Sequence, residues 1–131
     1  MTNLMFDNLK PIPATFLDKR AWFAENAEAF AVLDGFPVSP GHTLVLPKRS
    51  VFSLFQLDSG SYADVWSLVK YVRYLLDEEF SPAGYNIGIN EGTAAGQTIG
   101  HAHVHIIPRY AGDRPNPRGG VRAVIPGKAD Y

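Results

Sequence analysis

The chain has 131 residues, 46% of them hydrophobic and 19% charged, which is the balance of a globular chain large enough for one core. A formal net charge of −1 argues against a surface that coats nucleic acid polymers, because such domains are strongly basic. The absence of cysteine excludes disulfides and thiolate metal sites.

The first elements in chain order are predicted to be a short helix and a hairpin. The helix would span residues 18–27 (DKRAWFAENA). AFAVLD at 29–34 and HTLVLP at 42–47 are predicted strands. The turn residues of the intervening GFPVSPG indicate that the two strands pair as a hairpin with a long loop.

The strongest predicted element is a helix over residues 61–80. Apolar residues recur there at intervals of three and four, which places them on one stripe that packs against a core. Ser61 and Asp64 resemble a capping box at its start, and Pro82 cannot continue it. The stripe consists of Val65, Leu68, Val69, Val72, Leu75 and Leu76.

Three more strands are predicted, at 85–90 (YNIGIN), 101–108 (HAHVHIIP) and 121–125 (VRAVI), the last in a tail rich in proline and glycine. The order strand, strand, helix, strand, strand favours an α+β fold, with an antiparallel β-sheet of about five strands and one long and one shorter helix. The chain has no run of about 18 apolar residues and no N-terminal secretory pattern, so we expect a cytoplasmic protein without a membrane partner.

Three of the four histidines lie at alternate positions of the segment GHAHVHIIPRY, residues 100–110. On a strand, His101, His103 and His105 would share one face at a spacing of about 7 Å, while the apolar residues between them would face the core. A solvated polar face accounts for one such histidine more easily than for three. The row therefore indicates a chemical site.

Two kinds of site fit the row. Histidine is a common zinc ligand, but the missing ligands would have to be His42 or a carboxylate, and the nearest carboxylates in sequence are Glu91 and Asp113. Alternatively, a neutral imidazole can attack phosphorus while neighbouring donors hold the phosphate oxygens. Gln97, Thr98 and the glycines just upstream of the row would supply such donors.

The segment AGQTIGHAHVHIIPRY at residues 95–110 resembles the signature of the histidine triad (HIT) family of nucleotide hydrolases and transferases. FAVLDGFPVSPGHTLVLPKR at 30–49 is similar to the first hairpin of that family. The resemblance covers about residues 27–110, which would form the core of a single domain over residues 1–131 with an irregular tail at 111–131. It implies the α+β fold of the family and its usual homodimer.

By this resemblance, His103 would be the nucleophile that attacks the α-phosphate and carries the nucleotidyl group. His105 would donate to the phosphate oxygens, and Gln97 would contact the phosphate or the leaving group. His101 would orient the others, with its carbonyl fixing the tautomer of His103 and its ring near His42.

The hairpin block implies the nucleoside side of the site. Asp34 corresponds to a carboxylate that accepts from the ribose hydroxyls, because an acceptor-only group can hold two donors. Val32 and Leu44 correspond to positions that line the base, although a place in the strand core explains them equally well. His42 corresponds to the fourth histidine of the family and would support the nucleotide site from behind the residues that touch the substrate. Asn90 and Thr98 would help to hold phosphate.

The activity implied is that of a nucleotide hydrolase that cleaves at the α-phosphate through a covalent nucleotidyl-histidine intermediate. The HIIPR ending is more similar to the dinucleoside polyphosphate hydrolase branch, which favours substrates of the diadenosine polyphosphate type. Nucleoside phosphoramidate hydrolysis, nucleotidyl transfer and a non-catalytic nucleotide-binding module remain alternatives. No cofactor or metal is expected to be bound by the protein itself, although a divalent cation such as Mg²⁺ can accompany a polyphosphate.

Several positions depart from the family pattern. The first 26 residues do not match it clearly, and Phe6 is a candidate contact for the base there. Gly100 stands where a larger residue is usual, which would loosen the start of the histidine strand. In the tail, Arg118 and Arg122 could reach a polyphosphate, although surface arginines are more often solvated.

Overall fold

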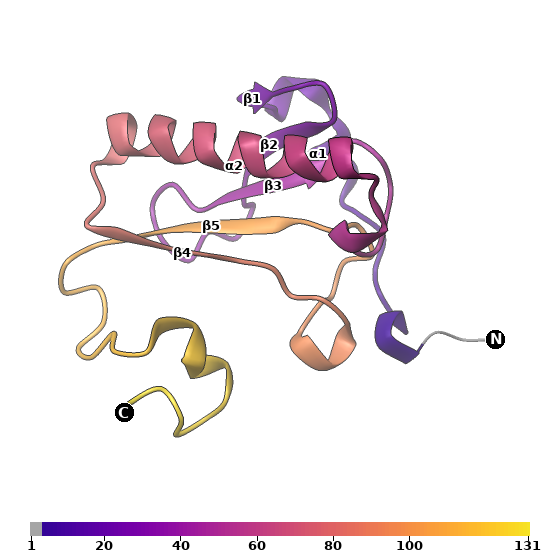
Figure 1. Ribbon diagram of the computed structural model, residues 1–131. Coiled ribbons are helices and arrows are strands. Elements are labelled where there is room, and N and C mark those ends of the chain that lie inside the picture. Colours follow the sequence, from indigo (N-terminus) through magenta and orange to yellow (C-terminus); the bar gives the residue numbers. More distant parts are fainter. Residues whose placement is uncertain (1–3) are drawn as a thin grey trace.

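In the computed structural model, which describes residues 4–131, a long helix crosses one face of a five-stranded antiparallel sheet (Figure 1). The spatial order of the strands is β1-β2-β3-β5-β4. The strands are β1 (Ala24–Glu25), β2 (Ala29–Leu33), β3 (Thr43–Pro47), β4 (Gly84–Gly88) and β5 (Val104–Arg109). The α-helices are α1 (Ala14–Leu17) and α2 (Ser59–Phe80), and short 3-10 turns lie at Leu4–Phe6, Lys19–Ala21, Leu54–Gln56, Thr93–Ala95 and Gly120–Val124. The predicted α+β fold is confirmed.

The predicted hairpin is present, with β2 and β3 paired residue by residue. One face of the pair, including Ala31 and Val45, packs under α2, and the other face, including Val32 and Leu44, packs against α1 and Trp22. Helix and loop segments cover the pair on both sides. This explains why both strands are almost continuously apolar.

Helix α2 begins two residues earlier than predicted, and its cap is different. The carboxylate of Asp58, not a box of Ser61 with Asp64, caps the helix by accepting from the backbone N–H of Ser61 at 2.8 Å. The apolar stripe is buried as predicted except for Leu75, which is half-buried. The helix ends at Phe80, before the left-handed Ser81 and before Pro82, as predicted.

Replacement of Asp58 by alanine is expected to lower the free energy of unfolding by about 1 kcal/mol, the usual cost of losing an N-terminal cap. Asp58→Asn is the matched control, because it keeps the capping oxygen while it removes the exposed ion pair with Arg49. Urea unfolding of both variants measures the difference. Equal losses in the two variants would contradict the assignment of the cap.

Two predicted elements are wrong. Residues 18–27 form a 3-10 turn and then the edge strand β1, because pairing of Ala24 with Ala31 and stacking of Trp22 on Phe30 outweigh the weak local helix preference. Residues 121–125 are not a strand. Gly119 and Gly120 adopt left-handed backbone angles that start the 3-10 turn Gly120–Val124 instead.

The histidine strand is shorter than predicted, since β5 begins at Val104 and only His105 of the three lies within it. The segment before β5 is nevertheless fixed by backbone hydrogen bonds from Gly100 to Lys10 and from Ala102 to Val51. A side chain at Gly100 would press on Phe52, so this glycine permits close packing and does not loosen the segment.

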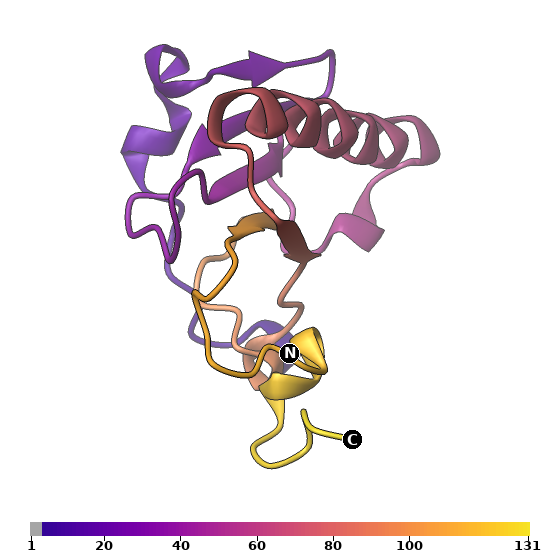
Figure 2. The same cartoon turned by 90° about the vertical axis from the view of Figure 1, so that its left-hand side faces the viewer.

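Both ends of the described chain lie on the side of the sheet that faces away from α2 (Figure 1). Lys10 bridges to Ile99, and the hydroxyl of Thr93 donates to the carbonyl of Asp7, so the N-terminal segment lines the loop before β5 (Figure 2). The C-terminal tail lies on the opposite side of the sheet from α2 (Figure 1). Across residues 4–131, none of the helices combines the length and apolar character needed to cross a membrane.

Candidate active site

A cavity of about 310 Å³, here called the histidine cavity, lies on the face of the sheet that α2 leaves free. His105 reaches it from β5 and Leu44 from β3, while His103 reaches it from the segment just before β5. The cavity also gathers residues from the loop after β2 and from the loop before β5. Of the predicted site residues, it is lined by Asp34, Leu44, Asn90, Gln97, Thr98, His103 and His105.

The ring of His103 is held by the backbone of the same segment. Its Nδ1 lies 2.8 Å from the carbonyl oxygen of His101. A carbonyl can only accept, so Nδ1 carries the proton and Nε2 keeps its lone pair. His103 therefore presents an unprotonated nitrogen, which is the requirement for attack on phosphorus.

His105 and His42 form a second hydrogen-bonded unit. The backbone N–H of Val38 donates to Nδ1 of His42 at 3.1 Å, so the proton of the neutral His42 ring lies on Nε2. That nitrogen is 3.0 Å from Nδ1 of His105 and donates to it. The remaining proton of His105 is thereby placed on Nε2. The unit thus gives His105 a free N–H donor.

Burial keeps three of the histidines neutral. Desolvation lowers the pKa of His105 to about 4, and nearby His103 and His42 add to the shift. Desolvation also lowers the pKa of His42 and of His101 below the ordinary value for histidine. At pH 7 these rings act as neutral hydrogen-bonding groups.

The buried histidines give a pH dependence of stability with a defined sign. Between pH 6.5 and about 4 the unfolded chain binds more protons than the folded one, so stability is complete above pH 6.5 and is lost toward pH 4. We expect a thermal midpoint at least roughly 4 °C lower at pH 4.5 than at pH 7, which corresponds to about 1 kcal/mol. Replacement of His105 by glutamine should weaken this dependence. A midpoint unchanged over this range would contradict the assignment.

His101 is positioned differently from the prediction. Its Nε2 donates to the carbonyl of Pro47 at 2.8 Å, and the ring is buried against the end of β3. The predicted place of this ring near His42 is therefore wrong, and the neighbour of His42 is His105. The predicted role of the His101 carbonyl toward His103 matches the observed hydrogen bond.

Gln97 lines the cavity, but its side chain is occupied by the loop itself. Its amide nitrogen donates to the carbonyls of Phe52 and Ile99, and its Oε1 accepts from the N–H of Gly92. A contact with phosphate would require one of these bonds to break. In the structure, Gln97 shapes the loop before His103. Thr98 and Asn90 are exposed at the rim.

The nucleoside side of the cavity is only partly as predicted. Leu44 lines it, and Oδ2 of Asp34 lies 3.5 Å from Nε2 of His42 while its Oδ1 accepts from the N–H of Phe36. Val32 instead lines a larger neighbouring cavity of about 760 Å³, between α1 and the C-terminal half of α2. The two cavities share Thr15, Phe16 and Gly35.

Several aromatic and tail residues lie elsewhere than the sequence predicts, and two aromatic residues of the cavity were not predicted. Phe6 stacks on Phe52 and does not line the cavity, whereas Phe16 of α1 and the exposed Phe36 do. No periodic signal in the sequence marked Phe16, because its turn of helix is only four residues long. Arg118 and Arg122 pack on the ring of Tyr131 and do not reach the cavity.

Within residues 4–131, one group of side chains could hold a metal ion. Ligand atoms of Asp34, His42 and His105 lie within 4.8 Å of one another, so Asp34 is the carboxylate that sequence spacing did not reveal. His101 and His103 are not part of this group. A metal here would have to replace the hydrogen bond between Nε2 of His42 and Nδ1 of His105.

The chain is similar to known proteins of one family. The family described as HIT domain matches residues 18–112. The chain is 44% identical over 77 residues to the asymmetrical bis(5'-nucleosyl)-tetraphosphatase of Schizosaccharomyces pombe, covering 59% of this chain and 42% of that protein. It is 39% identical over 88 residues to the bis(5'-adenosyl)-triphosphatase of Dictyostelium discoideum, covering 67% and 59%.

The fold is shared with solved structures as well. A HIT family protein from Bacillus anthracis is 34% identical, with a TM-score of 0.70 over 82% of this chain and 77% of that one. The chain spans between about two fifths and three fifths of the length of the first curated relatives that it matches.

Proposed function

The chain belongs to the HIT domain family, and we propose that it is a nucleotide hydrolase that cleaves at the α-phosphate through a nucleotidyl intermediate on His103. The observation that carries this proposal is the pairing of a nucleophile with a donor. His103 offers a lone pair on Nε2, and His105 beside it offers an N–H, with ring centroids 4.9 Å apart. One phosphate can meet both groups at once.

In the first step, Nε2 of His103 attacks the α-phosphorus, a P–N bond forms, and the P–O bond to the leaving group breaks. The leaving oxygen takes the electron pair of the broken bond. His103 becomes a positively charged nucleotidyl-imidazolium, and the carbonyl of His101 stabilises it by accepting from Nδ1. The N–H of His105 supports the charge that develops on the phosphate oxygens.

In the second step, water attacks the same phosphorus from the side of the departed group. The P–N bond breaks and its electron pair returns to Nε2 of His103, which restores the neutral ring. Water supplies the new oxygen of the nucleoside monophosphate and releases its proton to the solvent. Another acceptor in place of water would make the same intermediate a nucleotidyl donor, so transfer is the variant reaction of the same site.

Dinucleoside polyphosphates are the proposed substrates. The names of the similar proteins from S. pombe and D. discoideum support this class. The nucleoside would lie toward Leu44 and Phe16, with Asp34 accepting from ribose hydroxyls through an oxygen that already lies near His42.

The test is a panel of dinucleoside polyphosphates and nucleoside phosphoramidates, with adenine and with guanine, assayed for released nucleoside monophosphate. A higher kcat/KM for the dinucleoside polyphosphates than for the phosphoramidates supports the proposal. Higher kcat/KM for phosphoramidates assigns the chain to the alternative hydrolase. Tight binding of nucleotides without turnover of any member of the panel would contradict an enzyme and support a binding module.

Metal removal separates this chemistry from that of a metal site at Asp34, His42 and His105. After dialysis against EDTA, turnover of adenosine 5'-phosphoramidate is expected to stay within about twofold of the untreated protein, because the nucleophile and donor are side chains of the chain itself. Elemental analysis of the untreated protein is the control. A stoichiometric transition metal together with loss of turnover on chelation would contradict the mechanism.

A further inference from the structure

A second cavity, of about 350 Å³, lies beside the histidine cavity and is here called the tail cavity. Asn90 and His105 line both cavities, so the two meet at these residues. Its volume is in the range of small-molecule sites. The attack of His103 on the α-phosphorus uses only the histidine cavity. The tail cavity has no role in that step.

The tail cavity is largely apolar, with Asn86 on its floor and the polar side chains of Asn90, His42 and His105 where it approaches the histidine cavity. Its floor is the free face of β4 and β5, because Gly88 pairs with His105 and Asn86 with Ile107, and paired residues share a face. A side chain added at Gly88 would meet no atom within 4 Å, so this part of the floor is open. The cavity thus has an apolar body and a polar end.

The tail cavity is next to the residues that would hold the reacting phosphate. The ring centroid of His105 lies 4.9 Å from that of His103 and 5.3 Å from that of His42. His105 and His42 line the tail cavity, whereas His103 lines the histidine cavity. Because phosphoryl transfer proceeds in line, the group that leaves departs on the side away from His103. His105 lies beside His103 and lines both cavities, so the tail cavity adjoins the place where the phosphate would be held.

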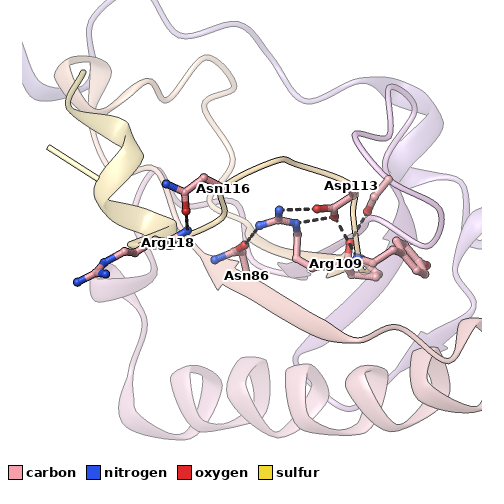
Figure 3. A network of polar contacts seen from close by, with 8 residues as sticks. Asn86, Arg109, Asp113, Asn116 and Arg118 are labelled. Atoms are coloured by element: carbon pink, nitrogen blue, oxygen red, sulfur yellow. Dashed lines mark hydrogen bonds and ion pairs between the residues drawn. The ribbon is translucent and has the colours of Figure 1, made fainter. Parts of the chain in front are cut away.

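The outer wall of the cavity comes from the tail, which is fixed to the sheet. The guanidinium of Arg109 donates to both carboxylate oxygens of Asp113 and to Oδ1 of Asn86 (Figure 3). Beyond this anchor, the side chains of Val121 and Val124 line the cavity although they are 65% and 77% exposed. These two valines lie outside the HIT match at 18–112.

We propose that the tail cavity binds the second nucleoside of a dinucleoside polyphosphate, the part that leaves with the remaining phosphates when His103 attacks. The proposal rests on the proposed function and names the half of the substrate that the histidine cavity does not hold. A flat, largely apolar base fits between the floor at Gly88 and Ile107 and the valines of the tail. The polar end at Asn90 and His105 then faces the polyphosphate.

The test compares two substrates that differ in the leaving group. Diadenosine triphosphate loses a nucleoside diphosphate, whereas adenosine 5'-phosphoramidate loses only ammonia and needs no second nucleoside site. Two variants change the tail cavity independently: the double variant Val121→Ser/Val124→Ser removes the apolar wall, and Gly88→Val fills the floor with a residue that strands favour. In both, the ratio of kcat/KM for the dinucleotide to that for the phosphoramidate is expected to fall about tenfold.

Ile125→Ser is the matched control, because Ile125 is an exposed apolar residue next to the same turn but does not line the cavity. Its ratio should equal that of the unchanged protein. If the ratio stays unchanged in both cavity variants, whether activity is kept or falls equally on both substrates, the proposal about the tail cavity is overturned. The proposed hydrolase activity of the unchanged protein would still stand. If the unchanged protein turned over neither substrate, the proposed function would fail and this inference with it.

Discussion

Replacement of His103 by alanine is expected to lower kcat for nucleotide hydrolysis by at least about 10⁴-fold, because the reaction loses its nucleophile and none of the other three histidines offers the same lone pair. His101 cannot substitute, since its ring is buried against Pro47. His105 cannot substitute either, since Nδ1 accepts from His42 and Nε2 carries the proton. Steady-state release of nucleoside monophosphate measures the loss.

The same variant should still bind nucleotide. The side chain of His103 is only one part of the cavity wall, and the nucleoside side at Asp34, Leu44 and Phe16 remains. Calorimetric titration with a nucleoside monophosphate is expected to give a Kd within about threefold of the unchanged protein, less than 1 kcal/mol. Near-native turnover by His103→Ala would remove the nucleophile from the mechanism. A loss of both binding and thermal stability would show that the change acts on the fold.

Replacement of His105 by alanine is expected to lower kcat by about 10²–10³-fold, the usual effect of losing one donor to a developing phosphate charge. Replacement of His42 should cost less, about 10–100-fold, because His42 acts only by fixing which nitrogen of His105 carries the proton. His42 is thus a positioning residue, and kcat should fall with little change in KM.

The double variant separates this relation from two independent effects. If His42 acts through His105, the variant that lacks both rings is expected to lose no more activity than His105→Ala alone. Losses that multiply in the double variant would show that His42 contributes to the reaction separately. The phosphoramidate is the substrate of choice, because its small leaving group does not depend on the tail cavity.

Much of the site can be predicted from the spacing of residues close together in the sequence. The alternation of His101, His103 and His105 with apolar residues indicated an extended segment, and the hairpin of residues 29–34 and 42–47 carried Asp34 and His42 to the same side of the sheet. These features are set by short-range periodicity and by one turn, which a sequence displays directly.

What the sequence did not reveal depends on contacts between distant segments. The ring of His101 found its partner in Pro47 and not in His42, and the 18–27 segment became an edge strand because Ala31 offered a backbone partner. The tail wall at Val121 and Val124 depends on the anchor of Arg109 to Asp113 and on the left-handed Gly119. No periodic pattern records such pairings.

The central claim is a covalent bond between Nε2 of His103 and the α-phosphorus, and rapid quenching tests it most directly. The protein is mixed with a nucleoside phosphoramidate or a dinucleotide and stopped in alkali within milliseconds, because phosphorus–imidazole bonds are labile in acid. Mass spectrometry of the digested chain then locates any added nucleotidyl group. The account predicts this group on His103 at a level that forms and decays within one turnover. An unmodified His103 during active turnover, or the group on His105, would contradict it.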